Sequence, residues 1–200
     1  MPVYTSTHRP LIYTAIASYV DTFIQFCMSE ASPEREYPIV IGCQEQPLPD
    51  KHILYNCEQL SRENHLKNVV EKAADPRVVE IWDYSVANIA YLAPYGIKAR
   101  HVPLCTVDPY LTAIRSYSLQ PKQYDVGFCG GISVRRRDIL IGLMKRGVTI
   151  HVVKQWGEER DRALGTCRAM LNVHYADNYK VFESARCEPW LAAGVPVLTE

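Results

Sequence analysis

Two glycines after an apolar run, followed by three arginines, are the residues of this chain best suited to bind an anion. The run Asp125–Cys129 leads into Gly130 and Gly131, and Arg135–Arg137 follow a few residues later. Backbone N–H groups of such a turn approach a phosphate without a Cβ in the way. Successive helical residues are rotated by about 100°, so at least one arginine is expected to point back toward the glycines. The alternative is a tight turn followed by a solvated basic face.

A second polar group follows another apolar run. Asn172, His174 and Tyr175 lie at the end of an expected strand, where open α/β sheets bind their ligands. Glu183 and Arg186 are three residues apart on an expected helix and therefore share a face. The Glu183 carboxylate suits hydrogen bonds from ribose or sugar hydroxyls, or it pairs with Arg186. His174 is equally consistent with a hydrogen-bonded structural histidine.

The elements that position these residues alternate between short apolar runs and amphipathic stretches, which predicts parallel strands connected by helices. The pattern weakens between about residues 108 and 124, where Pro109 and Pro121 predict a domain boundary. We therefore expect an α/β protein with two Rossmann-like domains, residues 1–118 and 119–200. The strands expected in the first domain are 11–16, 38–42, 53–56, 78–82 and 99–104, and the helices are 18–28, 61–74, opened by Ser61 and Glu63, and 86–92. In the second domain, the expected strands are 125–129, 149–153, 169–173 and 195–199, and the helices are 134–145, 158–167 and 179–193.

Composition restricts the class of protein. A chain of 200 residues with 48% hydrophobic residues is long enough for one large core or two small ones. The formal net charge is zero, which argues against a nucleic-acid-binding surface. Seven cysteines without zinc-ligand spacing are expected to be free thiols in a reducing compartment. The apolar runs are far shorter than the roughly 20 residues of a membrane span, so we expect a cytoplasmic protein.

Taken in order, these motifs resemble the donor-binding half of glycosyltransferases with two facing Rossmann-like domains, the GT-B fold. The likeness is to small bacterial and viral members, and it covers roughly residues 50–200. It is carried by strand-Gly-Gly, Arg-Arg, residues 171–175 (LNVHY), 182–186 (FESAR) and 191–197 (LAAGVPV), with 55–60 (YNCEQL), 82–85 (WDYS), Asn88 and 101–104 (HVPL) in the first half. Many such enzymes have two glutamates eight residues apart, but Leu191 lies eight residues beyond Glu183, a departure from the commonest retaining families.

The resemblance implies transfer of a hexosyl or deoxyhexosyl group from a nucleotide-diphosphate sugar, with a UDP-sugar favoured, to a glycan or other hydroxyl acceptor on the first domain. The expected donor-binding residues are Gly130, Gly131, Arg135, Arg136, Lys154, Asn172, His174, Tyr175, Phe182, Glu183 and Arg186. The other major glycosyltransferase fold carries an Asp-x-Asp metal motif, and none occurs in this sequence. We therefore expect no metal and no cofactor, with arginines and backbone N–H groups stabilising the leaving diphosphate.

An inverting transfer also needs a general base near the acceptor hydroxyl. Candidates at expected strand ends or helix starts are Asp21, Glu58 and Asp83. Asp83 precedes the expected helix 86–92, and its alternative role is to cap that helix with no part in catalysis. A retaining transfer has no obligatory base, so the stereochemistry stays open.

Two other functions fit the same residues. A nucleotide-sugar epimerase or hydrolase would use the donor site without transfer to an acceptor. A non-catalytic nucleotide-binding module of a longer multidomain protein would bind without turnover. The sequence stops at Glu200, directly after an apolar run, so we expect an abbreviated second domain or a segment of a longer polypeptide.

Overall fold

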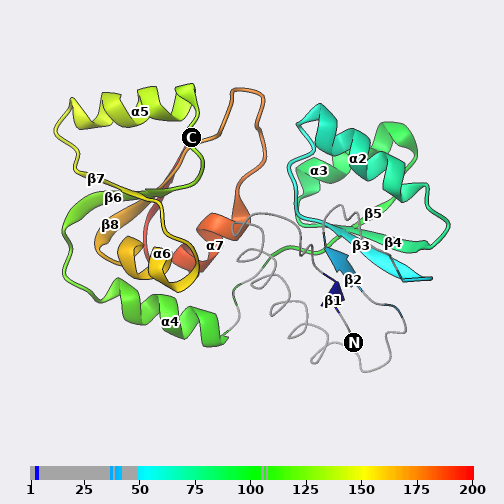
Figure 1. The fold of residues 1–200 in the computed structure, drawn as a ribbon, viewed down its shortest axis with the longest axis horizontal. Helices are drawn as coiled ribbons and strands as arrows, with labels where there is room; N and C mark the ends of the chain where they lie inside the picture. The colour runs from blue at the N-terminus through cyan, green and yellow to red at the C-terminus, as the bar shows by residue number, and fades with distance from the viewer. Residues whose placement is uncertain (1–2, 5–36, 38, 42–48, 105, 107) are drawn as a thin grey trace. The chain divides into compact units, whose positions relative to one another are not determined.

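The computed structural model describes residues 3–4, 37, 39–41, 49–104, 106 and 108–200. They form an α/β protein with two parallel sheets, of the kind expected from the alternating pattern (Figure 1). The chain divides into two compact units, Met1–Leu104 and Cys105–Glu200. The expected strand 11–16, the expected helix 18–28 and Asp21 lie outside the described residues.

In the first unit, five parallel strands lie in the sheet in the order in which they occur along the chain. The strands are β1 (Val3–Tyr4), β2 (Ile39–Ile41), β3 (His52–Asn56), β4 (Val78–Asp83) and β5 (Ala99–His101). Every residue of β2 and β3 is buried, as the continuous apolar runs predict for strands inside a parallel sheet. The sheet therefore has one direction, and its carboxyl ends share one edge.

Among the described residues of this unit, helices follow the strands β3 and β4. They are α2 (Glu63–Ala73), α3 (Val86–Leu92) and the 3-10 helix η1 (Ala93–Tyr95). Val69 on α2 and Leu92 on α3 pack with Leu60 in a buried cluster. The expected helix start at Ser61 is wrong, because Arg62 holds the N-cap position with extended backbone and makes no side-chain capping bond.

Four parallel strands form the second sheet, in the order β7-β6-β8-β9. They are β6 (Tyr124–Cys129), β7 (Ile150–Val153), β8 (Cys167–Asn172) and β9 (Val197–Thr199). The helices of this unit are α4 (Asp108–Ser118), α5 (Val134–Met144), α6 (Gly157–Leu164) and α7 (Ser184–Ala192). Each expected strand of the second half is present within two residues at either end.

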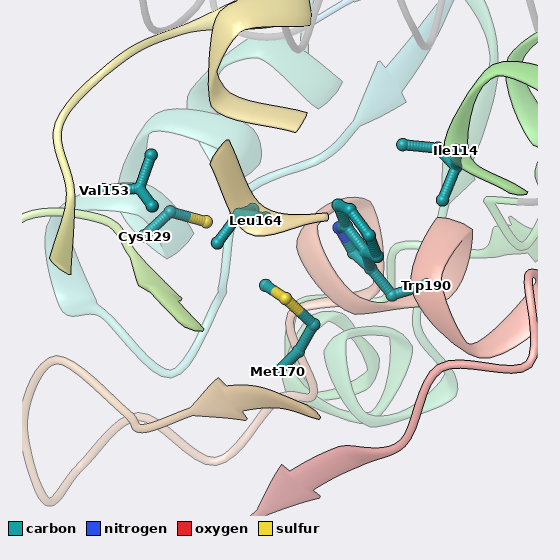
Figure 2. Close-up of a cluster of buried hydrophobic side chains, with 6 residues drawn as sticks. All are labelled: Ile114, Cys129, Val153, Leu164, Met170 and Trp190. Carbon is teal, nitrogen blue, oxygen red and sulfur yellow. The ribbon is translucent and has the colours of Figure 1, made fainter. Parts of the chain in front are cut away.

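Both faces of the second sheet are covered. On one face, Leu140 of α5 packs against Phe128 and Leu171. On the other face, α4, α6 and α7 pack together, and Trp190 of α7 lies in one cluster with Ile114 and Met170 (Figures 1 and 2). A parallel sheet covered in this way has the layered architecture of the Rossmann-like class.

The connections after β6 and β8 leave the sheet on opposite faces. The chain passes from β6 into α5 on one face, and from β8 into α7 on the other. The two strands are neighbours, with Val126 paired to Ala169. This is the topological switch point of the sheet, the position at which open α/β sheets bind their ligands.

Two expectations for the second half are corrected. The segment from Asp108 to Ser118 is a helix, because Pro109 lies in its first turn, where proline is tolerated. That helix packs with α6 and α7, so the division between units falls after Leu104 and not between residues 118 and 119. The last helix begins at Ser184 instead of Tyr179, which leaves residues 173–183 as a loop.

Candidate functional site

Arg136 joins the two loops at the switch point. Its guanidinium donates to the backbone carbonyl of Gly131, after β6, at 2.9 Å and to that of Val173, after β8, at 2.8 Å. A third bond, of 2.8 Å, goes to Oε1 of Glu183. The side chain is 3% exposed, and burial, with the charge of Arg186 next, lowers its pKa. The expectation that one arginine points back toward the glycines is confirmed, and the contact is with a carbonyl.

Glu183 joins this arginine to a second one. Its Oε2 pairs with the guanidinium of Arg186, which also donates to Oδ1 of Asn172 at 3.4 Å. Glu183 holds the N-cap position of α7, yet its carboxylate makes no capping bond because it is engaged by the arginines. Of the two alternatives for Glu183, the structure shows the pairing with Arg186, and Asn172 shares in it.

Gly130 gives these guanidinium groups room. Its φ is 131°, a conformation that side-chain-bearing residues rarely adopt. A Cβ at this position would lie 3.0 Å from Nη2 of Arg186 and 3.3 Å from Nη1 of Arg136. The bare face of Gly130 is thus filled by arginine side chains of the same unit.

Arg135 belongs to a separate, more exposed network. It donates to both carboxylate oxygens of Glu200, to Asp177 and to the carbonyl of His174. The backbone N–H of His174 also donates to Glu200. These bonds raise the pKa of Arg135 and lower that of Glu200. The network ties the end of β9 to the loop after β8.

Aromatic side chains border the same edge. The guanidinium carbon of Arg136 lies 5.4 Å from the ring centroids of both Phe128 and Tyr175. Tyr175 also packs against Tyr179, with ring centroids 5.7 Å apart. Phe128 is buried, whereas Tyr175 is 43% exposed. The exposed ring leaves an apolar surface beside the charged groups.

Nine of the eleven predicted donor-binding residues therefore lie in or beside these two arginine networks. His174 lies there through its backbone, and its Nδ1 is buried with no hydrogen-bond partner among the described residues. The predicted residues that the structure does not bring into these networks are Lys154, which follows β7, and Phe182, which is 38% exposed.

At the carboxyl edge of the first sheet, Asp83 is fully buried among amide groups. Its carboxylate accepts hydrogen bonds from Nδ2 of Asn56 at 2.6 Å, Nδ2 of Asn88 at 3.0 Å and the N–H of Ser85 at 2.8 Å. Burial raises the pKa of Asp83 to about 6. The sequence placed Asp83 on an open rim, which is wrong, since the side chain is 0% exposed. Its bond to Ser85 instead forms the turn that begins α3.

Glu58 is the more accessible of the two described base candidates. Its backbone is bound to Asn56 and Asn88, which fixes the turn after β3. Its carboxylate lies 3.4 Å from Nδ1 of His65, and its side chain is 26% exposed. This separation is that of an ion pair when the imidazole is protonated, and it is longer than the roughly 2.6–3.2 Å of direct proton transfer.

The described part of the chain contains neither a cluster of metal ligands nor a membrane-spanning helix. No group of three or more His, Cys, Asp or Glu side chains there is arranged to hold a metal ion. None of the helices there is long and apolar enough to cross a membrane. The four described cysteines, at positions 57, 129, 167 and 187, are free thiols.

Comparison with known proteins finds viral relatives of unassigned activity. The chain is 38% identical over 154 residues to "Uncharacterized protein L140" of Acanthamoeba polyphaga mimivirus, covering 74% of this chain and 48% of the relative. It is 35% identical over 155 residues to "Uncharacterized protein L137" of the same virus, covering 76% of this chain and 21% of the relative. The chain thus spans about half the length of the first relative and about a fifth of the second. No family model and no solved structure matches the chain.

Sequence reasoning missed two carboxylates of the second unit and the amide network of the first. Glu200 and Asp177, which hold Arg135, were not selected. Glu200 directly follows an apolar strand. That position at the carboxyl edge of the sheet could have indicated Glu200 as a site residue. Asn56 is a candidate only through the family resemblance, yet its side chain binds Asp83. No spacing rule reveals such a contact between neighbouring strands.

Proposed function

We propose that this chain is a metal-independent glycosyltransferase, or part of one, that uses a nucleotide-diphosphate sugar. The second unit would bind the donor, and the first would bind the hydroxyl acceptor in a GT-B arrangement. The observation that supports this most directly is the cluster of Gly131, Arg136, Glu183 and Arg186 at the switch point of a parallel sheet. Ligands of open α/β sheets bind at that point. Two guanidinium groups sharing one carboxylate leave a net positive charge for an anion.

The chemistry assigned to these groups follows from the bond that is broken. Transfer breaks the bond between the anomeric carbon and the diphosphate oxygen, and charge develops on the leaving diphosphate. Fixed guanidinium and N–H donors stabilise such charge, so no metal ion is required by the proposal. The acceptor hydroxyl loses its proton as the new glycosidic bond forms. Glu58, with His65 beside it, is better placed to take that proton than the buried Asp83.

A UDP-sugar is the favoured donor, a glycan the favoured acceptor, and the cytoplasm the proposed location. Because the chain spans only part of its viral relatives, further domains of a longer protein belong to the same proposal. The second candidate function for this chain is a non-catalytic nucleotide-binding module. It is favoured by the same cluster of arginines and Glu183 at the switch point. A nucleotide-sugar epimerase or hydrolase would use the same donor site.

A ligand screen tests the proposal. The melting temperature of the full chain should rise with one of UDP, GDP, dTDP or CMP, or with the corresponding sugars, because ligand binding stabilises the folded state by mass action. Products are then analysed with and without a hydroxyl acceptor. Sugar transfer supports the proposal, a released or isomerised sugar without acceptor indicates hydrolysis or epimerisation, and binding without turnover indicates a module. No shift with any nucleotide would overturn it.

A further inference from the structure

The arginines near the glycine turn differ in how completely the protein itself uses them. Each of the three guanidinium nitrogens of Arg136 donates to a protein oxygen, and its side chain is 3% exposed. Arg135 is held by the carboxylates of Glu200 and Asp177. Neither arginine can turn toward a ligand without giving up charged or buried partners, which is costly.

Among the described residues, Arg186 has fewer protein partners than the other two cations, two against three each, although Arg135 is more exposed, at 28%. Its side chain is 18% exposed, and its bond to Asn172, at 3.4 Å, is long for a hydrogen bond. Its ion-pair partner, Glu183, is shared with Arg136. One carboxylate therefore compensates two guanidinium groups, and the positive charge left over is most exposed at Arg186.

The two glycines also differ in what lies beside them. The space beside Gly130 is filled by guanidinium groups, at 3.0 Å and 3.3 Å from a hypothetical Cβ. At Gly131, among the described residues, a Cβ would meet only Cε2 of Tyr175, at 3.8 Å. That distance is an ordinary van der Waals contact, so a methyl group fits beside Gly131 but is crowded beside Gly130. Gly131 is also exposed, whereas Gly130 is half-buried.

We infer that Arg186 is the residue that contacts the diphosphate of the ligand, that the diphosphate lies beside Gly131 and Tyr175, and that Arg136 is a positioning residue. Arg136 fixes the carbonyls of Gly131 and Val173 and, through Glu183, the orientation of Arg186. This inference rests on the proposed function, because it takes the ligand to be a nucleotide diphosphate.

The first experiment compares Arg186→Met with Arg137→Met in the full chain, using calorimetry with UDP and with uridine. Arg137 is an exposed arginine of the same helix as Arg136, and it pairs with its neighbour Asp138. Arg186→Met should weaken UDP binding at least about tenfold, because a charge-assisted hydrogen bond is lost, and leave uridine binding unchanged. Arg137→Met should bind UDP like the wild type.

The outcomes separate the inference from the proposed function. If the wild type binds UDP and Arg186→Met binds it equally well, the inference is wrong and the proposed function stands. If the wild type binds no nucleotide, the proposed function fails first. Equal losses of affinity for UDP and uridine in Arg186→Met would also overturn the inference. Uridine has no phosphate, so the loss of a diphosphate contact should not weaken its binding.

A second experiment tests Arg136 by the salt dependence of UDP affinity. Arg136→Lys keeps the charge, but a lysine cannot donate to all three partners of Arg136. The affinity for UDP should therefore fall, whereas the dependence of that affinity on ionic strength should stay as in the wild type. Arg186→Met should lose both affinity and salt dependence. A loss of salt dependence in Arg136→Lys matching that of Arg186→Met would make Arg136 a direct contact and overturn its positioning role.

The glycine pair offers a matched test of the approach path. Gly131→Ala should keep the melting temperature near that of the wild type, since its Cβ meets only an ordinary contact, and should weaken UDP binding. Gly130→Ala should lower the melting temperature, because both its φ and the nearby guanidinium groups oppose a side chain. Wild-type UDP affinity in Gly131→Ala would place the diphosphate elsewhere.

Discussion

The carboxyl edges of the two sheets place a carboxylate in opposite environments. In the first unit, Asp83 is buried among the amides of Asn56 and Asn88 and the N–H of Ser85, with no arginine among these hydrogen-bond partners. In the second, Glu183 lies between two guanidinium groups. Sequential strand order in the described part of the first sheet gives no switch point there, whereas the second sheet reverses at β6 and β8. The paired guanidinium groups thus lie at the sheet edge where the strand order reverses, whereas the edge with sequential strand order holds a carboxyl among amides.

The largest effect that would sharpen this comparison is expected from Arg136→Met. The substitution removes a buried guanidinium that holds two carbonyls and Glu183, and breaking such a buried pair costs about 3–5 kcal/mol in free energy of unfolding. Urea denaturation of Arg136→Met and of Arg137→Met measures it. The exposed Arg137 should change stability by less than about 0.5 kcal/mol. Equal changes in the free energy of unfolding for the two variants would show that the buried Arg136 does not stabilise this edge of the sheet.

A pH effect of intermediate size is expected from Asp83. Its pKa in the folded chain, about 6, lies above the usual 3.8, so the folded state binds the proton more tightly than the unfolded state does. The contribution of Asp83 to stability therefore rises as the pH falls from about 7 to about 5, by about 1 kcal/mol. Asp83→Asn lacks this titration.

The measurement is the difference in free energy of unfolding between the wild type and Asp83→Asn across that pH range. Subtracting the variant removes the contributions of other carboxylates, such as Asp75, whose pKa is lowered to about 2 by its bonds to Arg77. A difference that stays constant with pH would mean that Asp83 is not the buried, amide-bound carboxyl described above.

The smallest effect is expected from Arg135→Met. Its partners Asp177 and Glu200 are 91% and 34% exposed, and ion pairs at such positions contribute at most about 1 kcal/mol. Thermal unfolding should show a drop in melting temperature of a few degrees or less. A loss as large as that of Arg136→Met would show that the exposed network, and not the buried arginine, holds the loop after β8.

The sequence predicted most of the second sheet and the return of one arginine to the glycine turn, because helical rotation and strand periodicity are local properties. It could not predict the burial of Asp83. The end of a strand is an edge position, but whether that edge is covered depends on Asn88 arriving from a helix five residues later. The division of roles between Arg135 and Arg136 was equally hidden, because it depends on carboxylates 42 to 65 residues away.

The helix α4 was missed for a different reason. Pro109 favours a break between helices in the sequence pattern, but proline also fits the first turn of a helix, as it does in α4. The start of α7 at Ser184 was also missed. The sequence pattern of residues 179–183 continues that of the helix, so the helix was expected to begin at residue 179. In the structure, that stretch is the loop that brings Glu183 to the arginines.

The membership of α4 in the second unit has a practical consequence for exchanging or isolating that unit. Ile114 packs in the same buried cluster as Trp190 and Leu164 (Figure 2). A fragment that starts at residue 119 would lack Ile114 and expose the Trp190 indole. The exposed hydrophobic surface would favour self-association. Any cut that is meant to yield a soluble half must therefore fall ahead of Asp108.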